Sequence, residues 1–330
     1  MEPFAHISKN VVIGRDDFLF LYNGGHYVHD YHTRARRPSP ESVGAVWINI
    51  ESRRNYCFIN DIEYRHIIFP NKQMVLADFY PTDLTSVTDQ FLLGQDVRED
   101  ILDMYPLLES LGHDAWLKTD THLNDKGLIL SAIGIAESLL KEDLQHHTSS
   151  LLKKSFVRQR RGDLAIMLGE AGASLCEEEV LYHPFWIQHQ FTNSLPGGNN
   201  GLIDILINKN ATNDSRLLIY GDSFGRGCVS CLSYFFSHVM FCRSPFFHDE
   251  IASLYRPSYI LTQSIERYLP STMLDSERPF FLFYTVLGKH GKAFEGDKVF
   301  LEALNGELSY PRKPYHLFMD SLPEKGQYEH

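Results

Sequence analysis

The chain has 330 residues, 43% of them hydrophobic, and a chain of this length can bury a sizeable core. Its net charge of −11 and its pI of about 5.8 argue against general nucleic-acid binding, because phosphate backbones repel an acidic protein. No apolar run is long enough to span a membrane, and the odd number of cysteines, five, argues against a disulfide scaffold.

The N-terminal residues, Met1 to His6, do not combine a basic segment with an apolar one. The sequence as written therefore predicts no secretory signal and a cytoplasmic location. If a signal has been removed from a mature chain, the location is periplasmic or otherwise extracytoplasmic, and this alternative stays open.

The N-terminal third of the chain alternates between strand, loop and helix signals. Residues 10–21 are expected to form two short strands around a turn, and the proline-containing segment 34–40 a loop. The segment 42–65 is ambiguous. The apolar segment 74–77 is expected to be a buried strand, and 84–104 to contain a helix.

A helix is expected to begin after Asn124 or Asp125, either of which can cap its N terminus. An apolar face at helical spacing supports this helix: Leu128, Ile129, Ile133, Ala136, Leu139 and Leu140. His122 lies directly before the helix start, which is a rigid place to hold a catalytic base.

The second half of the chain predicts strands at 203–207, 217–220, 258–262 and 280–287, with a helix over 224–236. Strands that alternate with helices indicate an α/β domain with a mainly parallel sheet.

We expect residues 1–330 to form a single domain. It would carry an irregular insertion near 165–200 and a C-terminal extension over 275–330. The basic cluster from Lys153 to Arg161 is interpreted as a solvated face or loop.

A serine follows the apolar run 217–220, in the sequence Gly221-Asp222-Ser223-Phe224. A serine where a strand meets a turn and a helix has its hydroxyl lifted out of the backbone at the open end of a sheet. Backbone N–H groups at the start of that helix would form part of an oxyanion hole. Asp222 is expected to bond turn amides in a structural role.

About a hundred residues earlier, Asp120 and His122 are two positions apart and project to one side of an extended segment. Serine needs a base to accept its proton, and the histidine needs a carboxylate to orient it. One short loop would thus deliver both groups to Ser223.

Two further residues are candidates for substrate binding. Arg267, after the predicted strand 258–262, would line the site or contact an anionic sugar, with a structural ion pair of Glu266 as the alternative. Gln263 would assist the oxyanion hole.

Three histidines at a spacing of three, His26, His29 and His32, raise the question of a metal site. The spacing suits neither one strand face nor a pure helix, and no closing ligand is evident. We therefore interpret them as part of a polar loop near the mouth of the active site, and expect no metal.

These residues belong to longer segments that resemble the SGNH-hydrolase-like domain of the alginate O-acetyltransferase (AlgJ/AlgX-like) family. The order Asp, His, Ser is distinctive, because ordinary SGNH esterases place the serine first. The similar segments occur in family order across residues 14–269: Gly14 to Phe20, Pro70 to Lys72, Thr119 to Gly127, Gly162 to Leu164, Tyr220 to Gly225 and Glu266 to Leu269.

The resemblance implies a three-layer α/β/α sandwich and a catalytic triad of Ser223, His122 and Asp120. It also implies an acetyl-serine intermediate whose acyl group passes to a sugar hydroxyl of a glycan or polysaccharide. The acetyl donor would be an activated ester, acetyl-CoA or an acetyl-carrying membrane partner, with no cofactor. A carbohydrate acetylesterase with the same triad and a non-catalytic glycan-binding protein on this fold remain as alternatives.

Overall fold

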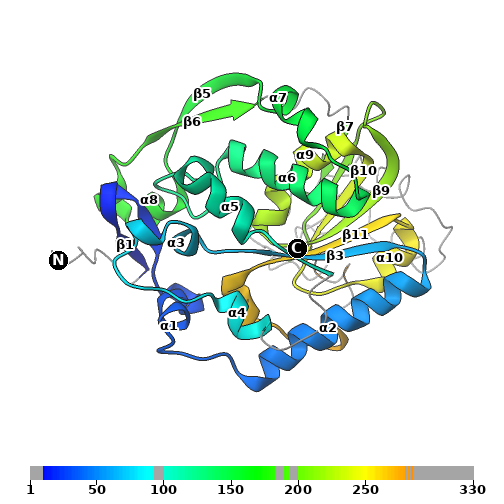
Figure 1. Cartoon of the computed structure of the whole chain (residues 1–330), viewed down its shortest axis with the longest axis horizontal. Coiled ribbons are helices and arrows are strands. Elements are labelled where there is room, and N and C mark those ends of the chain that lie inside the picture. The colour runs from blue at the N-terminus through cyan, green and yellow to red at the C-terminus, as the bar shows by residue number, and fades with distance from the viewer. Residues whose placement is uncertain are drawn as a thin grey trace, which may run out of the picture.

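A seven-stranded, mainly parallel sheet forms the centre of the molecule (Figure 1). The computed structural model describes residues 10–92, 100–182, 189–193, 200–278, 281 and 284. The strand order is β4-β3-β11-β9-β10-β8-β7, in which β8 runs antiparallel to β10, and β7 antiparallel to β8. The strands are β3 (Glu63–Phe69), β4 (Ile101–Asp103), β7 (His189–Thr192), β8 (Ile203–Ile207), β9 (Asn213–Gly221), β10 (Phe236–Arg243) and β11 (Tyr259–Ile265).

Two antiparallel pairs lie outside this sheet. One joins β1 (Val11–Ile13) to β2 (Leu19–Leu21), and the other joins β5 (Lys154–Arg160) to β6 (Glu177–Tyr182). The α-helices are α1 (Val28–His32), α2 (Pro40–Ile59), α3 (Lys72–Val75), α4 (Val87–Leu92), α5 (Tyr105–Leu111), α6 (Asp125–Leu140), α7 (Thr148–Leu151), α8 (Asp163–Met167), α9 (Ser223–Phe235) and α10 (Asp249–Tyr255). None of the helices in the described ranges is long and apolar enough to cross a membrane.

Successive side chains of a strand face opposite sides of a sheet, and both faces of this one are buried. Leu217 and Ile219 of β9 belong to a core shared with α6 and α9. Leu218 and Tyr220, the alternate residues, belong to a second core shared with α2 and α10. Figure 1 shows α6 and α9 on one side of the sheet, with α2 and α10 on the other.

The two connections that follow β9 in the chain cross opposite faces of the sheet. From β9 the chain passes through α9 to β10 on one face, and from β10 it passes through α10 to β11 on the opposite face. Because β11 and β10 flank β9, the carboxyl ends of β9 and β11 border the point where the strand order reverses. Such a point opens a crevice that α/β proteins commonly use to bind ligands.

Several predicted elements are present as expected. Residues 10–21 contain β1 and β2, and the ambiguous segment 42–65 contains most of α2 and the start of β3. The helix expected after Asn124 is α6, and the helix expected over 224–236 is α9, one residue displaced. The strands predicted at 203–207, 217–220 and 258–262 are β8, β9 and β11.

The segment 74–77 is not the strand that its apolar character predicts. It contains the end of α3 and the start of a short 3-10 helix, Ala77–Phe79. A run of four apolar residues has no period that separates helix from strand. The buried ammonium of Lys72, at the start of α3, donates hydrogen bonds to backbone carbonyls of the neighbouring segments and so holds α3 against them.

Other segments match the predicted secondary structure only in part. Within 84–104 the structure has α4 and then β4, with 93–99 outside the described residues. The region 165–200, expected to be irregular, contains the end of α8 as well as β6 and β7. Of the strand predicted at 280–287, the described residues are Phe281 and Tyr284, both helical; the rest of it and the extension to 330 lie outside the described residues.

Candidate active site

The turn that carries Ser223 connects the end of β9 to the start of α9. Asp222 caps the helix: its Oδ1 accepts a hydrogen bond from Phe224 N at 2.8 Å, and its Oδ2 accepts one from Ile265 N at 2.8 Å. These hydrogen bonds give Asp222 the structural role that the sequence predicted. They place Ser223, the first residue of α9, at the crevice between β9 and β11.

The loop before α6 carries Asp120 and His122. Asn124 caps α6 by accepting a hydrogen bond from Gly127 N at 2.9 Å, which fixes the end of this loop. Asp120 Oδ1 lies 2.8 Å from His122 Nδ1 and 2.9 Å from the His122 backbone nitrogen, which donates to it. The carboxylate thus orients the imidazole within its own loop.

The structure brings the three predicted catalytic residues into one chain of hydrogen bonds. His122 Nε2 lies 2.8 Å from Ser223 Oγ, across 101 residues of sequence, and His122 Nδ1 faces Asp120. Asp120 is buried, whereas the His122 side chain is 31% exposed and can be reached from the cleft. This is the geometry of a nucleophile, a base and an orienting acid.

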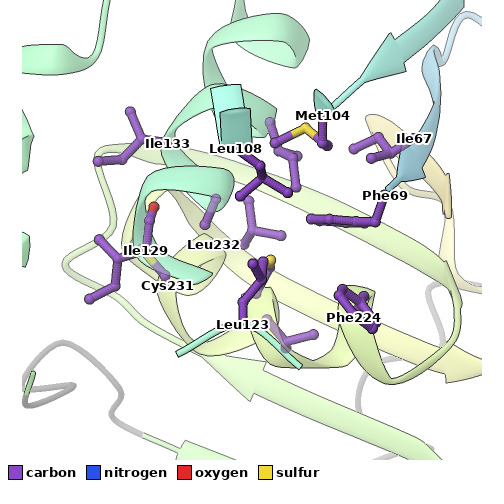
Figure 2. Close-up of a cluster of buried hydrophobic side chains, with 14 of the residues drawn as sticks. Ile67, Phe69, Met104, Leu108, Leu123, Ile129, Ile133, Phe224, Cys231 and Leu232 are labelled. Carbon is purple, nitrogen blue, oxygen red and sulfur yellow. The ribbon is translucent and has the colours of Figure 1, made fainter. Parts of the chain in front are cut away.

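The residues that follow His122 and Ser223 anchor both loops in one core. Leu123 and Phe224 are buried in the same hydrophobic cluster, which Figure 2 shows together with Ile129 of α6 and Phe69 of β3. The rings of His122 and Phe224 have centroids 5.2 Å apart. Close packing of the two anchors therefore holds the separation of base and nucleophile.

Arg160 is a member of the site that the sequence analysis missed. Lys153, Lys154 and Arg158 are exposed, as the predicted solvated face requires, but Arg160 is half-buried: it donates from Nη2 to Asp120 Oδ2 at 2.8 Å and from Nη1 to Glu179 Oε1 at 3.0 Å. Burial would raise the pKa of Asp120, but hydrogen bonds and charge from His122, with the charge of Arg160, hold that pKa well below its usual range. Asp120 is therefore an ionised partner for His122.

Asp163 is the second missed member, although it lies in one of the segments that carry the family resemblance. Its Oδ1 accepts from Thr121 N at 2.7 Å, its Oδ2 accepts from Thr121 Oγ1, and Oδ2 lies 3.5 Å from His122 Nδ1. Burial and the charge of Asp120 raise the pKa of Asp163. Among the described residues, the group of three side chains close enough to hold a metal ion is Asp120, His122 and Asp163.

A buried lysine holds the backbone beneath Asp120. Lys72, 3% exposed, donates from Nζ to the carbonyl oxygens of Leu19, Leu117, Lys118 and Asp120 at 2.6–3.0 Å. Burial lowers the pKa of Lys72 to about 7, against the opposing charges of nearby carboxylates. In the segment Pro70 to Lys72, Lys72 thus holds the backbone of the Asp120 loop in place, a structural role that the sequence did not predict.

Three of the first four backbone amides of α9 have acceptors near the turn. The amides of Phe224, Gly225 and Arg226 donate to Asp222 Oδ1, Gln263 Oε1 and the Asp222 carbonyl. The Ser223 amide has no acceptor among the described residues.

Gln263, expected to assist that hole, supports the turn with its oxygen. Its Oε1 accepts from the amides of Asp222 at 3.0 Å and of Gly225 at 2.9 Å. Its Nε2 is buried and has no hydrogen-bond partner among the residues that the structure describes.

Arg267 lines the cleft that contains Ser223 and His122. Its guanidinium donates to Asn71 Oδ1 at 3.2 Å and lies over the Phe224 ring, 5.5 Å from the centroid. Glu266 turns away from the cleft, where its Oε1 accepts from Asn71 N at 2.6 Å and lies 3.6 Å from His32 Nε2. The structure thus contains both features weighed for this pair, a cleft-lining arginine and a structural glutamate.

The three spaced histidines do not converge. His26 lines the cleft, His29 Nδ1 lies 3.0 Å from Tyr80 Oη, and His32 Nδ1 lies 2.9 Å from the Thr85 carbonyl oxygen. Burial and the charge of Arg267 lower the pKa of His26. The expectation of a polar segment near the mouth of the site therefore holds for His26 alone.

Comparison with known proteins finds similarity in structure and none in sequence. No protein-family model matches the chain. No curated protein matches it either. The structure of Bacillus cereus PatB1 with a sulfonyl adduct superposes with a TM-score of 0.58 at 13% identity, over 78% of this chain and 97% of PatB1.

A DHHW family protein from Eubacterium siraeum superposes with a TM-score of 0.53 at 14% identity, over 80% of this chain and 95% of its own. The O-acetyltransferase domain of Pseudomonas putida AlgJ gives a TM-score of 0.46 at 17% identity, over 82% of this chain and 96% of the AlgJ domain. The first two matches, at 13% and 14% identity, show that this chain shares their fold.

Proposed function

We propose that the protein is a serine-dependent acyltransferase that moves an acetyl group to a sugar hydroxyl of a glycan or polysaccharide. The observation that carries the proposal is the chain of two 2.8 Å hydrogen bonds from Asp120 through His122 to Ser223 Oγ. A serine hydroxyl is a weak nucleophile until a base accepts its proton, and this arrangement supplies that base in a fixed orientation.

In the proposed first half-reaction, Ser223 Oγ attacks the acetyl carbonyl and His122 Nε2 takes its proton. Ionised Asp120 stabilises the imidazolium that forms. The donor alcohol or thiol leaves with the proton from His122, and an acetyl-serine remains. In the second half-reaction, His122 takes the proton of an acceptor hydroxyl, and the new ester forms as Ser223 is released.

The free Ser223 amide would donate to the developing oxyanion, and the positive end of the α9 dipole would add to its stabilisation. Arg267 and His26 line the same cleft and would contact the sugar acceptor. Water in place of the sugar hydroxyl gives a carbohydrate acetylesterase, with the same residues in the same roles. The family resemblance of the motifs favours transfer.

The family resemblance also bears on architecture and location. We infer that the cores on the two faces of the sheet make up the outer layers of a three-layer α/β/α sandwich. A single domain, with an insertion near 165–200 and an extension from 275, fits this inference. A polysaccharide acceptor favours the extracytoplasmic alternative over the cytoplasmic location, and fractionation of the native host would decide between them.

The decisive experiment is an intact-mass measurement after incubation with an activated acetyl ester. We expect an added acetyl group on the wild type and none on Ser223→Ala. PatB1, which shares the fold, forms a sulfonyl adduct. Phenylmethanesulfonyl fluoride is therefore a second probe, expected to modify the wild type and to spare Ser223→Ala.

Candidate sugars added to the acetylated protein then separate the two enzyme classes. Acetylated sugar as the product indicates a transferase, and release of acetate alone indicates an esterase. If neither probe labels the wild type and no ester is turned over, the acyltransferase proposal is wrong. Glycan binding without turnover would then support a non-catalytic glycan-binding protein.

A further inference from the structure

A second cavity, of about 420 Å³, lies behind the turn that carries Ser223. The Gly221–Asp222 turn borders it, and it shares His26, Arg243 and Tyr268 with the Ser223 cleft. The two spaces therefore adjoin at these three side chains. The volume falls within the range of small-molecule binding sites.

Two buried polar atoms in the cavity wall are unpaired within the described part of the chain. His66 is 4% exposed and Gln263 6% exposed, and neither Nε2 has a hydrogen-bond partner among the described residues. Two backbone amides donate to the Gln263 oxygen, so its unpaired atom is the NH₂ donor. Buried polar groups are nearly always paired in native proteins, so this donor is available to an oxygen of a molecule in the cavity.

The remaining wall combines apolar residues with neutral polar side chains, among them Asn49, Ser244 and Thr272, and its charges offset one another. Arg53 forms an ion pair with Asp275, its Nε 2.7 Å from Asp275 Oδ2, and the carboxylate of Asp222 lies within the field of Arg243. A charged ligand would therefore gain little. The apolar residues of the wall are Val46, Ile50, Pro245, Phe246, Leu269 and Met273. The wall suits a neutral group that combines a short aliphatic segment with an oxygen.

The position of His122 indicates which part of a substrate enters this cavity. His122 lines the Ser223 cleft but not the cavity. Because it must return a proton to the departing oxygen, the alcohol side of the donor ester lies in the cleft. The acyl chain, on the other side of the reacting carbon, extends away from His122.

We propose that the cavity binds the acyl chain of the donor, so that the enzyme also transfers acyl groups that are longer than acetyl and carry a neutral oxygen, as in a hydroxyacyl group. The inference rests on the proposed acyl transfer at Ser223. In that transfer the acyl carbon forms a bond to Ser223 Oγ as its bond to the donor oxygen breaks, and the serine proton leaves on the donor alcohol through His122. The chain stays in the cavity until the acceptor hydroxyl displaces Ser223.

The test compares kcat/KM for the 4-nitrophenyl esters of acetate, butyrate, 3-hydroxybutyrate and succinate, each normalised to its rate with hydroxide. Burying one methylene group raises kcat/KM by about fourfold. We therefore expect kcat/KM for butyrate to exceed that for acetate by about fifteenfold. We expect 3-hydroxybutyrate to exceed butyrate, because its hydroxyl pairs with Gln263, and the anionic succinate to fall below butyrate. A preference for acetate over both longer neutral esters would overturn the inference.

A matched pair of variants on α2 tests the cavity itself. Ile50 is buried in the cavity wall, whereas Ile48 is 54% exposed and does not line it. Ile50→Trp should bring the ratio of butyrate to acetate turnover down to about one, since each lost methylene contact costs about fourfold. Ile48→Trp should keep the wild-type ratio.

Folding is checked by the melting temperature and by acetate turnover, and Val46→Phe is the second filling variant if Ile50→Trp does not fold. An unchanged ratio in the filled and folded variant would place the acyl chain elsewhere. Failure of the wild type to turn over any ester would instead overturn the proposed function, and with it this inference. Turnover of acetate without a chain-length preference would overturn the inference alone.

Discussion

Arg160 Nη2 donates a 2.8 Å hydrogen bond to Asp120 Oδ2, while Asp120 Oδ1 lies 2.8 Å from His122 Nδ1. The carboxylate is thus held from both sides, by a guanidinium from β5 and by the imidazole of its own loop. Arg160 does not reach Ser223 in this arrangement and acts on the proposed chemistry through Asp120. It is a positioning residue.

Replacing Arg160 with methionine should lower kcat by about tenfold to a hundredfold, the range expected for a lost hydrogen bond to a charged group. Arg158 is the matched control, because it also binds Glu179 from β5 but does not contact Asp120. Arg158→Met should keep most of the activity. Equal losses in the two variants would mean that the Glu179 ion pairs, and not Asp120, are responsible.

Arg160→Met should also change the pH dependence of kcat in a defined direction. The positive charge of Arg160 lowers the pKa of Asp120, so its removal raises that pKa. Protonation of Asp120 on the acid side then begins at higher pH, and the acid limb of kcat should move toward neutrality. A rate–pH profile of Arg160→Met and Arg160→Lys checks this, with lysine expected to restore part of the shift. An identical acid limb in all three proteins would contradict the positioning role.

Removal of the buried ammonium of Lys72 should unfold the loop beneath Asp120. Lys72→Met leaves several buried carbonyl oxygens without a donor, and we expect a loss of at least about 3 kcal/mol in the free energy of unfolding. Lys118→Met is the control, because the ammonium of Lys118 binds the Asp16 carbonyl at an exposed position. Urea unfolding of both variants measures the difference, and similar stabilities would show that the four carbonyls find other donors.

Gly162 is packed too closely against the Asp120 loop to carry a side chain. A Cβ at this position would overlap the carbonyl oxygen of Thr119, which is backbone and cannot rotate away. Gly162→Ala should therefore lower both stability and activity, by about 2 kcal/mol or more in the free energy of unfolding. Gly44→Ala in α2, where a Cβ meets no atom within 4 Å, should instead stabilise by about 0.5–1 kcal/mol. Thermal unfolding compares the two; a neutral Gly162→Ala would mean that the loop shifts freely.

Glu250 should make the protein sensitive to acid. Burial would raise its pKa, but hydrogen bonds from His248 and from Phe281 N outweigh this and lower it to about 2. Its folded pKa is thus below the unfolded value of about 4.3, so its contribution to stability is present above about pH 4.3 and is lost as the pH falls toward 2.

Melting temperatures between about pH 6 and about pH 2 measure that contribution. The decline should be shallower in Glu250→Gln than in the wild type, while Glu51→Gln, exposed on α2, should follow the wild type. A wild-type decline in Glu250→Gln would assign the acid sensitivity to other carboxylates.

Short-range chemistry determined the parts of the site that the sequence predicted. The Asp222 cap, the Asn124 cap and the Asp120–His122 hydrogen bonds each join residues two or three positions apart. Local spacing therefore predicts them, and the alternation of strands and helices predicts the α/β class. The pairing of this loop with Ser223 was a prediction from chemistry, and the 2.8 Å contact between His122 and Ser223 agrees with it.

Only the tertiary structure decided which other side chains surround that pair. Arg160 contacts Asp120 over 40 residues of separation and Lys72 over 48, while the Gln263 oxygen meets the Gly225 amide over 38. In the sequence, Arg160 is one of several clustered basic residues and Lys72 follows a turn signal. Nothing in their local spacing distinguishes them, because packing of the β5–β6 pair, α3 and β11 against the two loops selects their partners. The cavity behind the Ser223 turn has the same origin, since its walls come from α2, β3, β10 and β11 together.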